Sequence, residues 1–439
     1  MGAPHVSCGR AQPEEQKART MNTVDPSIAS LAGVGRRLTW TLFAAQSLGS
    51  AAFIAAATLA SILGAELSGS KALAGIPSAV YMTGTAGAAL AWGYLMESLG
   101  RRGGLVLGLA IGAFGAALAY GAINAGSFVL FLAGLVLMGV ASAALTLGRF
   151  ASAEVHPPAE RGRAISTVVL GGTVGAVLGP LLVGPAGAWA EALGQRDLSG
   201  AYAISGLFLL VAGVVIFSLL RPDPREVGRA LAAHYPIEAN AAGGVRTLRA
   251  ILGGTDARLA ILAMVLGQAV MVMVMVITSL HMRAHDHGLG EVSAVISSHT
   301  LGMYAFSIVS GRLADRWGRR PTIAVGAAGL VLACVLATLS PAVIPLAVAL
   351  FVLGLGWNLC FVGGSTLLAD QLTPPERART QGFNDLLVGV ASAGGSLGSG
   401  LVFAAVGYNV MAWAGAALAL VPLALALRRK RVALAAASA

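Results

Sequence analysis

Apolar stretches of about 20 residues recur along the whole chain, and this recurrence limits the possible folds more than any other feature of the sequence. A helix of about 20 apolar residues is long enough to cross the hydrocarbon core of a bilayer. The stretches therefore predict an all-α membrane protein with 12 transmembrane helices. The predicted segments are 38–63, 74–95, 104–124, 127–148, 164–186, 201–220, 259–281, 292–311, 322–340, 343–368, 385–406 and 409–427.

The charged residues support this class and give the chain an orientation. Only 11% of the residues are charged, whereas soluble domains carry about a quarter. With the N-terminus inside, Lys71, Arg196 and Arg283 fall in outer loops and all other Lys and Arg fall on the inner side. This asymmetry follows the positive-inside rule, so the net charge of +10 points to a lipid bilayer and not to nucleic acid. We expect a multi-pass protein with both termini cytoplasmic, and the strong preference for Arg over Lys suggests a bacterial inner membrane.

Two loops of the first half return in the second half at nearly the same offset. Residues 93–102 (GYLMESLGRR) correspond to residues 311–320 (GRLADRWGRR), 218 positions later, and residues 154–163 correspond to residues 370–379. The chain therefore divides into two six-helix bundles, and parallel repeats of this kind place a substrate site near the membrane midplane between them. The predicted parts are an N-terminal tail (1–37), a first bundle (38–220), a linker (221–258), a second bundle (259–427) and a C-terminal tail (428–439).

The repeated decapeptides resemble the G-x-L-a-D-r-x-G-r-r signature of the major facilitator superfamily. That resemblance implies the superfamily fold, a transport function, and charged contacts between helix ends that hold the cytoplasmic side closed. The first copy departs from the signature, because Glu97 replaces the aspartate and Ser98 replaces a basic residue. Simple anchoring of positive loops is the alternative, although anchoring needs no acidic residue. By this match the gate residues would be Gly93, Glu97, Arg101, Arg102, Gly311, Asp315, Arg316, Arg319 and Arg320.

Two pairs of potential metal ligands lie on the seventh and eighth predicted spans, Met271 with Met275 and His299 with Met303. Four-residue spacing places each pair on one helical face. At a rise of 1.5 Å per residue, Met271 and Met303 would lie about 15 to 17 Å below the outer surface, near the midplane. Thioether and imidazole groups suit soft cuprous copper, so we expect these four side chains to hold Cu(I). The alternatives are that the methionines fill gaps in packing and that His299 is a hydrogen-bonded core histidine.

The loop that follows the seventh span carries further ligands of the same type. Imidazoles and a thioether there could collect a metal before it enters the membrane. An ordinary polar loop is the alternative, because loops are routinely polar. The residues concerned are His281, Met282, His285 and His287.

The Met-x-x-x-Met and His-x-x-x-Met pairs resemble those of the CcoA-like copper importers, a bacterial branch of the major facilitator superfamily. The resemblance implies copper uptake, with Met271, Met275, His299 and Met303 as copper-binding residues. Copper would be the transported substrate, no resident cofactor is expected, and a cytoplasmic copper acceptor protein would be a partner. No family cysteine matches Cys334 or Cys360.

The sequence also allows other functions. The segment Gly175-Ala-Val-Leu-Gly179-Pro180 resembles the G-x-x-x-G-P element of drug:proton antiporters, although Ser166 replaces an upstream glycine of the fuller motif. Small residues at this spacing also let helices pack closely. A membrane factor that holds copper without transporting it is a further alternative. An enzyme is not expected, since the sequence contains neither a Walker loop nor an H-E-x-x-H motif.

Overall fold

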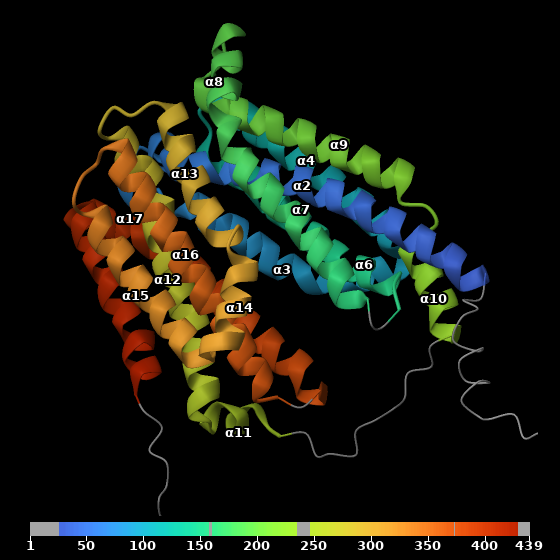
Figure 1. The fold of residues 1–439 in the computed structure, drawn as a ribbon. Coiled ribbons are helices and arrows are strands. Elements are labelled where there is room, and N and C mark those ends of the chain that lie inside the picture. The colour runs from blue at the N-terminus through green and yellow to red at the C-terminus, as the bar shows by residue number, and fades with distance from the viewer. Residues whose placement is uncertain (1–25, 158–159, 235–245, 373, 429–439) are drawn as a thin grey trace, which may run out of the picture.

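The computed structural model describes residues 26–157, 160–234, 246–372 and 374–428, and within these ranges the regular elements are helices. They form two bundles that lie side by side, α2 to α9 and α12 to α17 (Figure 1). The first bundle consists of α2 (Pro26–Ser68), η1 (Lys71–Leu73), α3 (Ile76–Ser98), α4 (Gly100–Asn124), α5 (Phe128–Thr146), α6 (Gly148–Glu154), α7 (Arg161–Leu181), α8 (Val183–Ala192), η2 (Asp197–Ser199) and α9 (Gly200–Leu219).

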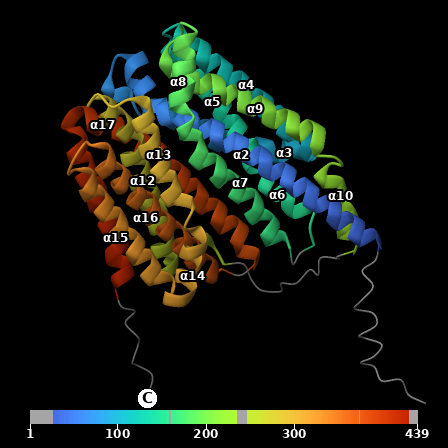
Figure 2. The same cartoon turned by 45° about the horizontal axis from the view of Figure 1, so that its top comes forward.

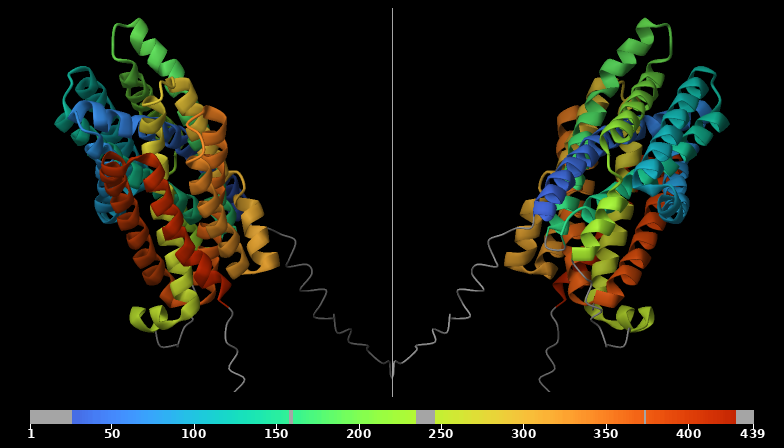
Figure 3. Two further views of the ribbon diagram at one scale, coloured as in Figure 1. Left: turned by 90° about the vertical axis from the view of Figure 1, so that its left-hand side faces the viewer. Right: turned by 90° about the vertical axis from the view of Figure 1, so that its right-hand side faces the viewer.

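The second bundle is connected to the first by a segment that is itself partly helical. Figure 3 shows α11 at the same end of the molecule as the last residues of α17, as expected if the linker and the C-terminus share one side of the membrane. The linker helices are α10 (Pro224–His234) and α11 (Leu248–Gly253). The second bundle consists of α12 (Thr255–Arg283), α13 (Leu289–Tyr304), α14 (Ser307–Trp317), α15 (Arg319–Ala337), α16 (Val343–Asp370) and α17 (Pro374–Leu427).

Each of the twelve predicted segments coincides with a helix or with a pair of helices separated by a short break, which confirms the fold class. Ten helices of the described ranges are long and apolar enough to cross a membrane. One of them contains two predicted segments, because the left-handed backbone of Gly407 (φ 79°) bends α17 into two helices. The predicted segment 74–95 forms α3, which is not among the ten.

Two boundaries differ from the prediction. Helix α2 begins at Pro26, so residues 26–37 extend the first span and do not belong to a non-helical tail. Proline is favoured in the first turn of a helix, where its missing N–H costs nothing. Helix α17 begins at Pro374, eleven positions before the predicted start at residue 385. The N-terminal ends of both helices therefore extend beyond their apolar segments.

The glycines of the G-x-x-x-G-P segment form a close contact between α7 and α2. A Cβ atom on Gly175 would lie 1.9 Å from the carbonyl oxygen of Ser47, and one on Gly179 would lie 2.5 Å from that of Ala51. Both distances are far below van der Waals contact, so only glycine permits this approach. Helix packing accounts for the segment without an exporter function.

The two bundles contact each other at the end opposite to α10 and α11. Figure 2 shows α13 of the second bundle beside α7 and α8 of the first. The hydroxyl of Ser396 donates a hydrogen bond of 2.8 Å to the carbonyl of Gly75, and a Cβ atom on Gly75 would lie 1.7 Å from the carbonyl oxygen of Ser396. Toward α6 and α14 the bundles diverge (Figure 1). The structure is therefore closed on the side away from the linker.

Candidate functional site

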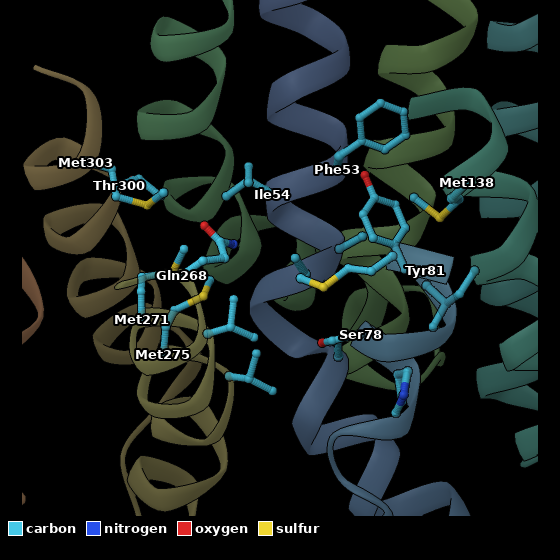
Figure 4. Close-up of a pocket in the computed structure, with 18 of the residues that line it drawn as sticks. Phe53, Ile54, Ser78, Tyr81, Met138, Gln268, Met271, Met275, Thr300 and Met303 are labelled. Atoms are coloured by element: carbon cyan, nitrogen blue, oxygen red, sulfur yellow. The ribbon is translucent and has the colours of Figure 1, made fainter. Parts of the chain in front are cut away.

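A cavity of about 170 Å³ lies between the bundles. Helices α2, α3 and α5 line one side, and α12 and α13 line the other (Figure 4). Most of the lining side chains are apolar, aromatic or thioether groups, and none of the lining residues is charged. They include Phe53, Ile54, Ser78, Tyr81, Met82, Leu135 and Met138 from the first bundle and Gln268, Met271, Met275, Thr300, Met303 and Tyr304 from the second.

Three of the four residues predicted to hold copper border this cavity. Met271 and Met303 are buried and Met275 is half-buried. Figure 4 shows Met271 and Met275 on α12 and Met303 on α13, on the same side of the cavity. The three thioethers therefore line one cavity between the bundles, on the two helices where the sequence predicts them.

His299 does not line the cavity, which corrects the predicted four-residue site. Its side chain is completely buried, and Nδ1 lies 2.9 Å from the carbonyl oxygen of Leu350 on α16. Because a carbonyl only accepts, Nδ1 carries the hydrogen and donates it. The helices are close here, since a Cβ atom on Gly354 would lie 2.3 Å from the carbonyl oxygen of His299. The cavity face of α13 is instead formed by Thr300, Met303 and Tyr304.

The orientation of the Gln268 amide is fixed by its neighbours. The indole Nε1 of Trp357 donates to Oε1 of Gln268 at 2.7 Å, and Nε2 of Gln268 donates to the Ser392 hydroxyl at 2.8 Å. An indole N–H can only donate, so the amide oxygen must face Trp357. One N–H and one lone pair of Gln268 remain for a ligand in the cavity. Gln268 therefore offers a donor and an acceptor side by side on an otherwise mainly apolar wall.

The predicted outer capture residues do not form a common metal site. Met282 is fully buried in the core, because α12 continues to Arg283 and carries it inward. The His281 ring stacks on Tyr408 at 4.1 Å between centroids. His287 contacts the carboxylate of Glu291 at 3.1 Å, and His285 contacts the carbonyl of His281 at 2.9 Å. Among the described residues, no three histidine, cysteine or acidic side chains are grouped as metal ligands.

In the second bundle, the predicted gate residues form ion pairs that remain within that bundle. Arg319 contacts Asp315 at 2.7 Å and Asp370, at the end of α16, at 3.1 Å. Arg320 contacts Asp256, at the start of α12, at 2.7 Å. Arg316 does not take part in these ion pairs in the described ranges. A Cβ atom on Gly311 would meet open space, so packing does not require a glycine there.

The first bundle repeats the arrangement with one addition that the sequence did not reveal. Nε of Arg101 donates to both carboxylate oxygens of Glu154, at 3.0 and 3.1 Å. Asp223 of the linker accepts hydrogen bonds from the backbone N–H groups of Arg101 and Arg102, so it caps the start of α4. Glu97 forms no ion pair within 4.0 Å in the described ranges; its carboxylate interacts with Arg101 only at longer range, and its backbone carbonyl accepts a hydrogen bond from Arg225. A Cβ atom on Gly93 would again meet open space.

Several cavity residues were not recognised from the sequence. Phe53 and Tyr81 are ordinary aromatic residues of apolar segments, and their ring centroids lie 6.1 Å apart in the cavity wall. The available signal was the group of hydroxyl side chains at the start of α3, because a lipid-facing helix has no need of them; they are Ser78, Tyr81, Thr83 and Thr85.

The sequence matches the family model of the Major Facilitator Superfamily over residues 40–290 and 259–438, which together span both bundles. The chain belongs to the major facilitator superfamily. It is 36% identical over 392 residues to the "Uncharacterized MFS-type transporter YdeG" of Bacillus subtilis (88% of this chain, 90% of the relative). It is 30% identical over 403 residues to the "Riboflavin transporter RfnT" of Brucella anthropi (91% and 98%).

A solved structure shows the same superfamily fold. A bacterial homologue of the human lysosomal transporter Spinster, in an inward-facing and unoccupied conformation, matches with a TM-score of 0.67 at 14% identity (89% of this chain, 96% of the other). The superfamily resemblance seen in the sequence is confirmed, and the chain is a multi-pass membrane transporter. The narrower resemblance to CcoA-like copper importers receives no support from these relatives.

Proposed function

We propose that this superfamily member is a secondary transporter of a planar, uncharged organic solute. The observation that carries the proposal is the cavity between the bundles, which combines aromatic and thioether side chains with a fixed amide and has no charged lining residue. A mainly apolar pocket with a few fixed polar groups is the usual form of an organic ligand site. A charged solute would lose its hydration in this cavity without gaining an opposite charge.

A flat heteroaromatic ring suits these groups best. Phe53, Tyr81 and Tyr304 border the cavity and offer stacking or edge contacts. Methionine sulfur also makes favourable contacts with aromatic rings. The free N–H and lone pair of Gln268 match a ring edge that carries an acceptor next to a donor. The name of the relative from Brucella anthropi supports a flavin as the first probe.

We place the protein in a bacterial inner membrane with both termini in the cytoplasm, on the charge asymmetry of the sequence. The contact of Ser396 with Gly75 then closes the outer side, and the cavity would open inward by rocking of the bundles. Alternating access in this form exposes one midplane site to each side in turn.

The proposal is tested by counterflow of radiolabelled riboflavin in liposomes that contain the purified protein, an assay that needs neither the transport direction nor the coupling ion. We expect exchange, and Gln268→Ala should raise the half-saturation concentration about fivefold, the effect of one neutral hydrogen bond. The matched control is Gln195→Ala, because Gln195 is exposed in an outer loop. Absence of exchange for riboflavin and for a panel of uncharged planar heterocycles would overturn the proposal.

Cu(I) is the second candidate substrate, favoured by one observation, the three thioethers of Met271, Met275 and Met303 around the cavity. Leucine has nearly the volume of methionine but no sulfur. The double substitution Met271→Leu with Met275→Leu should therefore abolish copper movement and leave flavin exchange within about threefold of the parent. If the parent protein moves ⁶⁴Cu(I) and not flavin, copper is the substrate and a cytoplasmic acceptor protein becomes the expected partner.

The remaining alternatives give different results in the same liposomes. A drug:proton antiporter would exchange a hydrophobic cationic dye and would respond to an imposed proton gradient. A copper-holding factor would bind Cu(I) without exchanging it. The uncharged lining of the cavity favours the planar neutral solute over both.

A further inference from the structure

A second compartment of about 260 Å³ adjoins the cavity between the bundles. The two spaces share the lining residues Phe53, Ile54, Tyr81 and Tyr304, so they form neighbouring parts of one path. Unlike the first cavity, the second is rich in hydrogen-bonding side chains. This polar compartment is lined by Gln46, Ser50, Ser142, Thr146, Arg149 and Thr173, together with apolar residues.

Arg149 gives the polar compartment its strongest donors. It lies on α6, and its Nε atom is buried with no hydrogen-bond partner among the described residues. Its guanidinium lies 4.9 Å from the centroid of the Phe150 ring, a contact that uses none of the N–H groups in a hydrogen bond. A guanidinium has five N–H donors, and a buried donor without an acceptor is unfavourable. An incoming oxygen acceptor would therefore bind well.

A carboxylate in the facing bundle offsets part of this positive charge. Asp385 on α17 interacts electrostatically with Arg149, although no ion pair within 4.0 Å joins them in the described structure. Asp385 offsets part of the positive charge of Arg149, and the amide and hydroxyl groups that line the compartment both donate and accept hydrogen bonds. Such surroundings favour hydroxyl groups, which both donate and accept, over a phosphate or carboxylate.

We propose that the polar compartment binds an uncharged, hydroxylated chain attached to the ring that occupies the first cavity. The transported solute is then amphipathic, with a planar ring between Phe53 and Met271 and a polyol chain beside Arg149 and Thr173. This inference rests on the proposed function, and it adds the requirement for a second, polar part of the substrate.

The test compares three flavins in counterflow with the full-length protein. Lumiflavin has the ring without the chain, riboflavin has the ring with a hydroxylated chain, and flavin mononucleotide has the same chain with a phosphate. We expect riboflavin to compete at least about fivefold better than lumiflavin, since the chain adds at least one hydrogen bond. The phosphate ester should compete less well than riboflavin.

Substitutions then assign the preference to this compartment. Arg149→Gln should bring the riboflavin-to-lumiflavin ratio close to one, because it weakens the exchange of riboflavin more than that of lumiflavin. Thr173→Val, which keeps side-chain shape, should lower the same ratio and provides a second reading if Arg149→Gln fails to fold. The control is Arg229→Gln, because Arg229 is exposed on α10 outside the membrane.

The outcomes separate this inference from the proposed function. Equal competition by lumiflavin and riboflavin would overturn the chain subsite and leave ring transport intact. Stronger competition by the phosphate ester would show an anion site and overturn the uncharged chain. If Arg149→Gln weakens riboflavin and lumiflavin equally, Arg149 acts through the closing of the bundles and does not bind the chain. That result would also overturn the chain subsite. Loss of exchange for every flavin would remove the proposed function itself.

Discussion

The indole N–H of Trp357 donates a 2.7 Å hydrogen bond to Oε1 of Gln268, and this contact fixes the direction of the amide in the cavity wall. Trp357 is itself held by the ring of Phe361, stacked at 5.1 Å between centroids, and by the edge of Tyr304 at 6.3 Å. The cavity thus has a polar group whose orientation is set by helices α16 and α17, because Ser392 of α17 holds the other end of the amide. Pre-organisation of this kind raises affinity by reducing the entropy lost on binding.

Replacement of Trp357 by phenylalanine should weaken substrate binding without unfolding the protein. Phenylalanine keeps the stacking on Phe361 and loses the N–H, so the Gln268 amide becomes free to rotate. We expect the half-saturation concentration for counterflow to rise about fivefold, equivalent to about 1 kcal/mol, with little change in maximal rate. Trp413→Phe is the control, because that indole is 54% exposed on the outside of the bundle. An equal effect of both substitutions would contradict the role of the hydrogen bond.

Gly75→Ala should prevent the outer side from closing. The new Cβ atom would lie 1.7 Å from the carbonyl oxygen of Ser396, and backbone atoms on both sides cannot move apart without separating the bundles. We expect the population to shift toward the outward-open form and exchange to fall at least about tenfold, since a clash of this size costs more than 1.4 kcal/mol.

Thiol labelling measures this shift directly. Ala72→Cys places a thiol at the outer contact, where Gly400 approaches Ala72. A membrane-impermeant maleimide added outside should label it faster in the Gly75→Ala background. The native Cys334 and Cys360 are buried and give little background, and Cys8 is replaced by serine in every variant. Gly87→Ala is the control, because a Cβ atom there meets open space; faster labelling in that variant as well would argue against a specific outer contact.

Much of the fold followed from the sequence because bilayer thickness sets the length of each span. The twelve predicted segments lie largely in helices, and the repeated motifs at 93–102 and 311–320 span the junctions of α3 with α4 and of α14 with α15. The helix starts at Pro26 and Pro374 were missed, since polar residues can continue a helix beyond the membrane and hydropathy does not detect them.

Sequence periodicity gives the helical face on which a residue lies, but it does not give the rotation of that helix in the bundle. Periodicity places Met271, Met275 and Met303 on particular faces, but the rotation of α13 depends on which neighbour it packs against most closely. Close contact of α13 with α16 at Gly354 turns His299 toward Leu350 and leaves Met303 facing the cavity. The sequence did not predict a binding role for Arg149. This residue lies just beyond the predicted end of its apolar segment, where arginine usually marks a membrane boundary.

His299→Leu should reduce stability and leave transport affinity unchanged. The substitution removes the hydrogen bond from Nδ1 to the carbonyl of Leu350, a loss of about 1 kcal/mol. Since His299 does not border the cavity, the half-saturation concentration for flavin or copper should stay the same. Thermal unfolding in detergent and counterflow measure the two effects. A large loss of copper affinity with normal stability would instead show that His299 binds the metal.

The arginines at the starts of α4 and α15, Arg101 and Arg319, should respond unequally to loss of their partners. Arg101 forms its ion pair with Glu154 alone, whereas Arg319 contacts both Asp315 and Asp370. Glu154→Gln should therefore slow transport several-fold and lower stability by roughly 1 kcal/mol, whereas Asp370→Asn should have a smaller effect because Asp315 remains. The double substitution Asp315→Asn with Asp370→Asn should lower stability and transport rate by more than the sum of the two single substitutions. This is expected for two carboxylates that share one partner. Transport rates and unfolding temperatures of the four variants test this, and strict additivity would mean that the two carboxylates do not substitute for each other at Arg319.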